Sequence, residues 1–195
     1  MIGIANIGIG TTQTVQNMLS YLDIESEITK DASSLSKYSH LILPGVGHYS
    51  EGSNLLSRNG WAQEIKSFAE SKPILGICLG MQLLGAGSEE GEGSGLNLLD
   101  FAVSKIIGNS SIRSPHMGWN SVSWVDKHDA PADERFYFVH GYYVDQIHEF
   151  TIGTTFYGQE FTSVIRSKNI WGFQFHPEKS HRYGMNVLRE FAESI

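Results

Sequence analysis

The chain has 195 residues, of which 41% are hydrophobic and 18% are charged, and these values predict one domain that buries its own core. Its 14 lysine and arginine residues against 21 aspartate and glutamate residues give a formal net charge of −7, which argues against a protein that grips nucleic acid through phosphate contacts. A single cysteine, Cys78, excludes both an intramolecular disulfide and a zinc site built from several cysteines.

Short apolar runs alternate with helical patterns through the first half of the chain. Strands are predicted at residues 1–8, 39–43 and 73–77, and helices at residues 11–22, 61–70 and 79–84. Such alternation is typical of βαβ units, so this half predicts parallel strands with helices on both faces of a sheet.

The second half has a different rhythm. Strands are predicted at residues 102–107, 120–125, 135–139, 162–165 and 170–175, and one helix at residues 183–195, whose apolar face ends at Ile195. We therefore expect an α/β fold, with a mixed, mainly parallel central sheet and an antiparallel extension, in a single domain of residues 1–195. No apolar stretch could span a bilayer and the first cationic residue is Lys30, so we expect a cytoplasmic protein without a signal peptide or membrane contact.

Cys78 lies at a predicted strand-to-helix turn, within the pattern Gly76-x-Cys78-x-Gly80. This is the pattern of a nucleophile elbow, with sulfur in place of the serine hydroxyl. Glycines are needed because larger side chains would collide with so sharp a turn, and the helix start favours a thiolate and offers the N–H of Leu79 to an oxyanion. Free cysteines often only fill buried space, so the motif favours catalysis without establishing it.

Of the eight histidines, His176 has the context best suited to a general base. A predicted strand ends at it and Pro177 keeps the next step extended, so Glu178 projects to the same side and can fix the imidazole tautomer. Cys78, His176 and Glu178 would together form a triad for attack on a carbonyl. The alternatives are that His-Pro-Glu marks only a strand end and turn, or that His140 is the base.

A second oxyanion donor is predicted in the run Leu43-Pro-Gly-Val-Gly47, which leaves a strand. Its glycines let backbone approach a ligand closely, although a simple tight turn is the commoner use of such a sequence.

These motifs, in this order along the chain, resemble those of the class I (triad-type) glutamine amidotransferases. Pro115-His-Met-Gly-Trp-Asn120 and Tyr137-Phe-Val-His140 resemble more narrowly the glutaminase subunits of imidazole glycerol phosphate synthases. The resemblance implies a flavodoxin-like core and hydrolysis of L-glutamine to glutamate and ammonia through a γ-glutamyl thioester, with no cofactor and no metal. It makes Cys78 the nucleophile, His176 the general base and acid, and Glu178 its orienter.

The resemblance also implies further site residues. The oxyanion hole would be formed by Leu79, Gly45, Val46 and Gly47. Glutamine would be bound by Gln82, Glu90, His116 and Met117. A separate synthase subunit, expected to be a β/α barrel that forms a heterodimer with this chain and receives ammonia through a channel, would contact Thr11, Thr14, His116, Trp119, Tyr137 and Lys179.

The identity of the ammonia acceptor stays open between two pathways. Thr11 and Thr14 stand where the family usually carries asparagines that face the synthase barrel. Histidine biosynthesis is the preferred pathway, and a synthase that aminates a surface-polysaccharide sugar is the alternative. A stand-alone γ-glutamyl hydrolase and an inert binding module are the remaining hypotheses, and an intact triad argues against the last.

Overall fold

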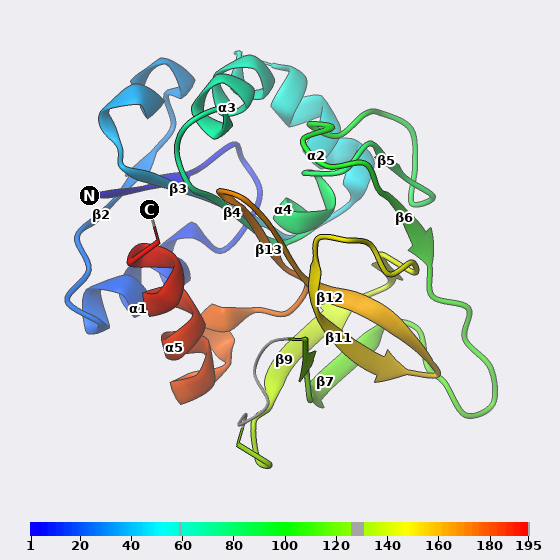
Figure 1. Cartoon of the computed structure of the whole chain (residues 1–195). Helices are drawn as coiled ribbons and strands as arrows, with labels where there is room; N and C mark the ends of the chain where they lie inside the picture. Colours follow the sequence, from blue (N-terminus) through cyan, green and yellow to red (C-terminus); the bar gives the residue numbers. More distant parts are fainter. Residues whose placement is uncertain (59, 126–130, 195) are drawn as a thin grey trace.

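A central sheet of eight strands organises the computed structural model, which describes residues 1–58, 60–125 and 131–194 (Figure 1). In spatial order the strands are β2 (Ser26–Thr29), β1 (Ile2–Ala5), β3 (His40–Gly45), β4 (Ile74–Cys78), β13 (Ile170–Phe173), β12 (Gln159–Ser167), β11 (Thr151–Tyr157) and β8 (Ser123–Trp124). The strands from β2 to β13 are parallel, whereas β12, β11 and β8 continue the sheet in antiparallel pairs. The predicted mixed, mainly parallel sheet is confirmed.

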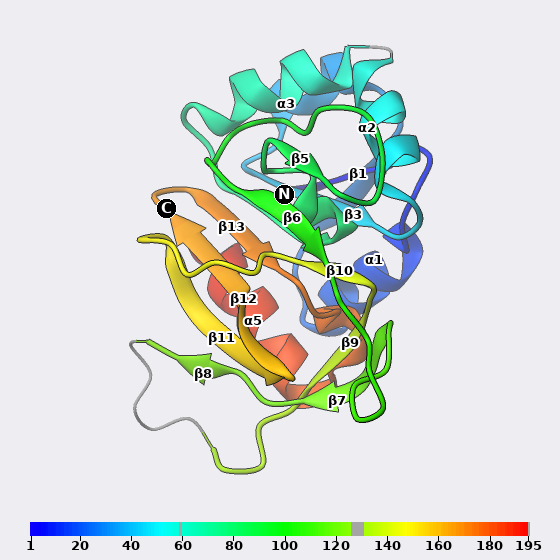
Figure 2. The ribbon, with the colours of Figure 1, turned by 90° about the vertical axis from the view of Figure 1, so that its right-hand side faces the viewer.

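Helices cover both faces of this sheet. Figures 1 and 2 place α1 (Thr12–Tyr21) and α5 (His181–Ala192) together on one side, with α2 (Tyr49–Ser57) and α3 (Trp61–Ala69) on the other. None of the helices in the described ranges is long and apolar enough to cross a membrane.

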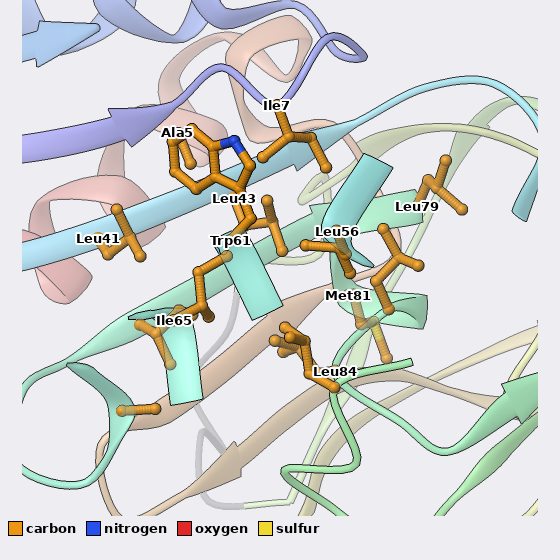
Figure 3. Packing of buried hydrophobic residues seen from close by; sticks show 14 of the residues in the cluster. Ala5, Ile7, Leu41, Leu43, Leu56, Trp61, Ile65, Leu79, Met81 and Leu84 are labelled. Carbon is orange, nitrogen blue, oxygen red and sulfur yellow. The ribbon is translucent and has the colours of Figure 1, made fainter. Parts of the chain in front are cut away.

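Strands β1, β3 and β4 are buried on both faces, because helices cover both sides of the sheet and successive side chains point to opposite sides. On β3, Leu41 and Leu43 join the cluster under α2 and α3, whereas Ile42 joins the cluster under α1 and α5. In Figure 3, Trp61 and Ile65 of α3 lie over this part of the sheet. Both side chains are buried, and truncating such a tryptophan to alanine typically costs about 3–5 kcal/mol.

Two smaller sheets complete the fold of the described residues. One consists of β10 (Tyr142–Tyr143), β6 (Ala102–Lys105) and β5 (Gly87–Ser88). The other pairs β7 (His116–Asn120) with β9 (Phe136–His140), and we call this pair the ribbon. Short helices follow two strand ends that matter for the site: α4 (Leu79–Gln82) after β4, and the 3-10 helix η2 (Pro177–Lys179) after β13; a further 3-10 helix, η1 (Ala32–Lys37), precedes β3.

Several elements differ from the sequence prediction. The predicted strand 120–125 is confirmed only at β8 (Ser123–Trp124): Asn120 instead ends β7, and its side chain accepts the Ser121 N–H at 2.8 Å between the two strands. Strands β2, β5, β7, β10 and β11 and helix α2 were not predicted. The final helix spans residues 181–192 rather than 183–195, and Ile195 lies outside the described residues.

Candidate active site

Cys78 occupies a strained turn between β4 and α4, with φ +55° and ψ −111°. A Cβ atom on Gly80 would overlap the carbonyl oxygen of Leu43, and one on Gly76 would lie 2.6 Å from the Gly80 carbonyl carbon. Both clashes involve backbone, which cannot swing aside as a side chain can. The glycines of the Gly-x-Cys-x-Gly pattern are therefore what allows the elbow to form.

His176 and Glu178 form a buried pair at the end of β13. His176 Nδ1 donates to Glu178 Oε1 at 2.8 Å, and the hydroxyl of Thr11 donates to the same oxygen at 2.9 Å. The His176 N–H donates to the Tyr137 carbonyl at 2.8 Å, which ties this strand end to the ribbon. These contacts fix the ring orientation and leave Nε2 as the nitrogen available for proton transfer.

The surroundings of His176 favour its charged form. Burial lowers the pKa of the ring, but the neighbouring Cys78 sulfur and the Glu178 carboxylate outweigh it and raise that pKa to about 10. The ring therefore holds its proton at neutral pH. A cationic imidazole beside a thiol favours the thiolate, which is the nucleophilic form of cysteine.

A cavity of about 240 Å³ opens in front of the thiol. It is lined by Val46, Gly47, Cys78, Leu79, Gln82, Glu90, Pro115, Val139, His140, Gly141 and Tyr142. The Glu90 carboxylate accepts the Tyr49 N–H at 2.8 Å, at the start of α2, so a negative charge is held in the cavity wall. The cavity thus combines a nucleophile with a fixed carboxylate that can bind an ammonium group.

The predicted oxyanion residues lie around the same cavity. Leu79, Val46 and Gly47 line it, and the N–H of Leu79 is the first of α4, so it has no acceptor within the helix. Gly45 pairs with Cys78 in the sheet, where an added Cβ would lie 2.6 Å from the Gly80 nitrogen. Gly47 has φ +119°, a conformation that side chains rarely adopt.

The four predicted glutamine-binding residues are divided. Gln82 and Glu90 line the cavity, whereas His116 and Met117 do not. His116 is buried inside the ribbon, and Met117, the next residue on a strand, points the other way and is 63% exposed. Pro115 is the residue of this segment that reaches the cavity.

The predicted partner residues form a group near the triad in which Trp119, Lys179 and Thr14 are exposed and Tyr137 is half-buried, with two exceptions. Trp119 stacks on His181 at 5.2 Å between ring centroids, and Lys179 Nζ lies 5.7 Å from the Tyr137 ring. Thr14 is exposed on α1. The exceptions are His116, which is 3% exposed and so has no surface to offer, and Thr11, whose hydroxyl is turned to Glu178.

Sequence reasoning did not single out Gln174. This buried side chain places Nε2 3.8 Å from the Cys78 sulfur, while its Oε1 accepts from Gln82 Nε2 at 3.1 Å. The available signal was a lone amide within an otherwise apolar, aromatic run. Among the described residues, no group of three or more histidine, cysteine, aspartate or glutamate side chains could hold a metal ion.

The chain is similar to known proteins along nearly its whole length. The family described as "Glutamine amidotransferase class-I" matches residues 4–195. "Imidazole glycerol phosphate synthase subunit HisH" of Lacticaseibacillus casei (strain BL23) is 42% identical, over 99% of this chain and 95% of that protein. "Imidazole glycerol phosphate synthase subunit HisH 2" of Pseudomonas aeruginosa (strain PAO1) is 36% identical, over the full length of both.

Solved structures share the fold at low sequence identity. "Crystal structure of glutamine amidotransferase" superposes with a TM-score of 0.75 at 19% identity, covering 98% of both chains. "Structure of PurLQS from Thermotoga maritima" gives a TM-score of 0.72 at 20% identity, over 97% of this chain and 96% of that one. At these identities the likeness establishes the architecture alone.

Proposed function

The chain belongs to the class I glutamine amidotransferase family, and on this premise we propose how its residues release ammonia from glutamine. It is the glutaminase subunit of an imidazole glycerol phosphate synthase and serves histidine biosynthesis. We propose that residues 1–195 act as one domain in the cytoplasm. The observation that carries the mechanism is the buried His176–Glu178 pair beside a thiol at a strained elbow, at the edge of a cavity with its own carboxylate.

The first half-reaction forms a thioester. The Cys78 thiolate attacks the side-chain amide carbon of glutamine. The resulting oxyanion accepts hydrogen bonds from the backbone N–H groups of Leu79 and of the Gly45–Val46–Gly47 segment. His176 Nε2 then gives its proton to the amide nitrogen, the C–N bond breaks, and neutral ammonia leaves. Glu178 stabilises the ring while it is charged and fixes its orientation.

The second half-reaction restores the enzyme. His176, now neutral, takes a proton from water as that water attacks the thioester carbon, and the C–S bond breaks to give glutamate and the thiolate. We assign Glu90 to the α-ammonium group of glutamine, because its carboxylate is held in the cavity wall by the Tyr49 N–H. Gln82 supports the cavity wall at Tyr142 by donating to its carbonyl at 3.0 Å.

A synthase subunit is the partner, and we propose that it is a β/α barrel docked as a heterodimer over Trp119, Tyr137, Lys179 and Thr14. Amphipathic aromatic anchors of this kind dominate interface energies. We expect Trp119→Ala or Tyr137→Ala to weaken the complex by about 1–4 kcal/mol, measured by titration calorimetry with the synthase subunit. Unchanged affinity in both variants would place the docking face elsewhere.

Glutamate production by the purified chain, alone and with a histidine-pathway synthase subunit, tests the function. We expect slow hydrolysis alone and a rise of orders of magnitude with the partner, because glycines let the Gly45–Val46–Gly47 peptide rotate toward the oxyanion at little steric cost. Equal turnover in both samples would favour a stand-alone γ-glutamyl hydrolase. Stimulation only by a sugar-aminating synthase would reassign the partner.

A further inference from the structure

Two buried histidines that take no part in this mechanism face each other across the ribbon. His116 of β7 and His140 of β9 are register partners, 3% and 6% exposed, with His116 Nδ1 3.0 Å from His140 Nε2. Only His140 also lines the cavity, next to Gly141 and Tyr142. The direction of the hydrogen bond between the two rings follows from their other neighbours.

Asn120 fixes one end of a chain of side-chain hydrogen bonds that runs through both histidine rings. Its Oδ1 accepts the Ser121 N–H at 2.8 Å and its Nδ2 donates to the Phe156 carbonyl at 3.0 Å, so the orientation of the amide is determined by two backbone groups. The same Nδ2 lies 3.3 Å from His116 Nε2, which must then accept. A neutral His116 therefore carries its proton on Nδ1 and donates to His140.

Tyr142 fixes the other end and gives the same answer. Its carbonyl oxygen can only accept, so His140 Nδ1, 2.8 Å away, carries the proton and His140 Nε2 is the acceptor for His116. Protonating either ring would set two N–H groups face to face. Burial supports the neutral state: it lowers the pKa of His116 to about 4, and burial together with the neighbouring His116 lowers that of His140 to about 3.

The Tyr142 carbonyl is also held from the side of the nucleophile. Gln82 Nε2 donates to it at 3.0 Å and to Gln174 Oε1 at 3.1 Å, and Gln174 Nε2 lies 3.8 Å from the Cys78 sulfur. The cavity wall at Tyr142 is thus clamped between the ribbon and the side chains behind the thiol.

We propose that His116 and His140 are positioning residues for glutamine: their one-directional hydrogen-bond chain from Asn120 holds the Gly141–Tyr142 wall of the cavity in register with Cys78. The proposal rests on the glutaminase function. Because His116 does not reach the cavity, its loss loosens the wall that binds substrate and leaves the reacting atoms in place. The effect should therefore be on KM rather than on kcat.

The proton positions can be measured without any activity assay. In long-range ¹H–¹⁵N correlation spectra of the full chain at neutral pH, we expect both His116 and His140 as neutral Nδ1–H tautomers. Histidine in water favours the Nε2–H form, so Nδ1–H tautomers at both positions would identify the hydrogen-bond chain. An Nε2–H tautomer or an imidazolium at either position would overturn the proposal whatever the enzyme's activity.

Kinetics with the synthase subunit present test the consequence. His116→Phe keeps the ring stacked on Tyr157 and Phe138, at centroid distances of 4.0 and 4.9 Å, but removes both hydrogen bonds. We expect KM for glutamine to rise about tenfold and kcat to change less than twofold. His40→Phe is the matched control, since that ring also makes two hydrogen bonds, to Ser39 and Ser194, but lies at the start of β3.

Two outcomes of this comparison contradict the proposal: a fall in kcat with KM unchanged in His116→Phe, or an equal rise of KM in the His40 control. If His116→Phe does not fold, Asn120→Ala removes the first donor of the chain, and its KM should rise about threefold. An unchanged KM in that variant also overturns the proposal. A wild-type protein that hydrolyses no glutamine would refute the proposed function. The tautomer spectra would still decide whether the hydrogen-bond chain through His116 and His140 exists.

Discussion

Cys78 lines the cavity and His176 interacts with it, but backbone packing holds the first residue and side-chain hydrogen bonds hold the second. Around Cys78, Gly76 and Gly80 leave room that no side chain could share. Around His176, the ring, Glu178 and Thr11 are joined by hydrogen bonds of 2.8 and 2.9 Å. A side chain that overlaps backbone can cost more than about 4 kcal/mol of folding stability in a single substitution. The loss of one hydrogen bond from a network costs about 1–3 kcal/mol. The substitutions that follow probe this difference.

Cys78→Ala should have the largest effect on activity. Alanine fits the elbow because only the sulfur is removed, so fold and partner binding should stay intact while glutamine hydrolysis falls by at least about 10⁴-fold. Turnover is measured as glutamate release with saturating synthase subunit, and circular dichroism verifies the fold. Activity within tenfold of the parent would contradict the assignment of Cys78 as nucleophile.

Gly80→Ala should have the largest effect on stability. The added Cβ would overlap the Leu43 carbonyl oxygen in the middle of the central sheet, so we expect a loss of more than about 4 kcal/mol in the free energy of unfolding. Gly87→Ala is the matched control, because a Cβ there meets nothing within 4 Å and should change stability by less than about 0.5 kcal/mol. Urea unfolding of both variants gives the comparison, and similar losses in the two would show that the elbow tolerates a side chain.

His176→Asn should reduce turnover more than Glu178→Gln. The imidazole moves protons in both half-reactions, whereas the carboxylate orients it and stabilises its charge, so we expect losses of about 10⁴-fold and about 10²-fold. Removing the carboxylate should also lower the pKa of His176 below its present value of about 10, because Glu178 is one of the groups that raise it. An NMR titration measures this pKa. A greater kinetic loss for Glu178→Gln would reverse the roles of the two residues, and an unmoved pKa would show that Glu178 does not stabilise the charged ring.

The two sides of the site also differ in how far the sequence predicts them. The elbow is a local steric rule, so Gly76-x-Cys78-x-Gly80 is enough to predict it. The contact between Thr11 and Glu178 joins positions 167 residues apart, and nothing local encodes it. The resemblance assigned Thr11 to the partner surface, because the family usually carries an asparagine there that faces the synthase barrel.

The ribbon shows the same limit. Residues 135–139 alternate well enough to predict β9, but its partner β7 has a glycine at its centre and was not predicted as a strand. Once the pairing is known, period two places His116 inside and Met117 outside. The Tyr142 carbonyl, which the Gln82 and His140 side chains both contact, is backbone and leaves no trace in a residue pattern.

Thr11 should give the smallest effect. Its hydroxyl donates to the same Glu178 oxygen that the His176 ring contacts, so Thr11→Val keeps the shape of the residue and removes one support of the triad. A hydrogen bond to this buried carboxylate contributes about 1–2 kcal/mol, which corresponds to a loss of about five- to thirtyfold in kcat. Thr11→Ser, which keeps the hydroxyl, should restore most of it, and neither change should alter KM for glutamine, because Thr11 does not line the cavity. If both variants instead weaken synthase binding equally and leave kcat at saturating synthase unchanged, Thr11 acts at the partner surface, and the triad does not depend on its hydroxyl.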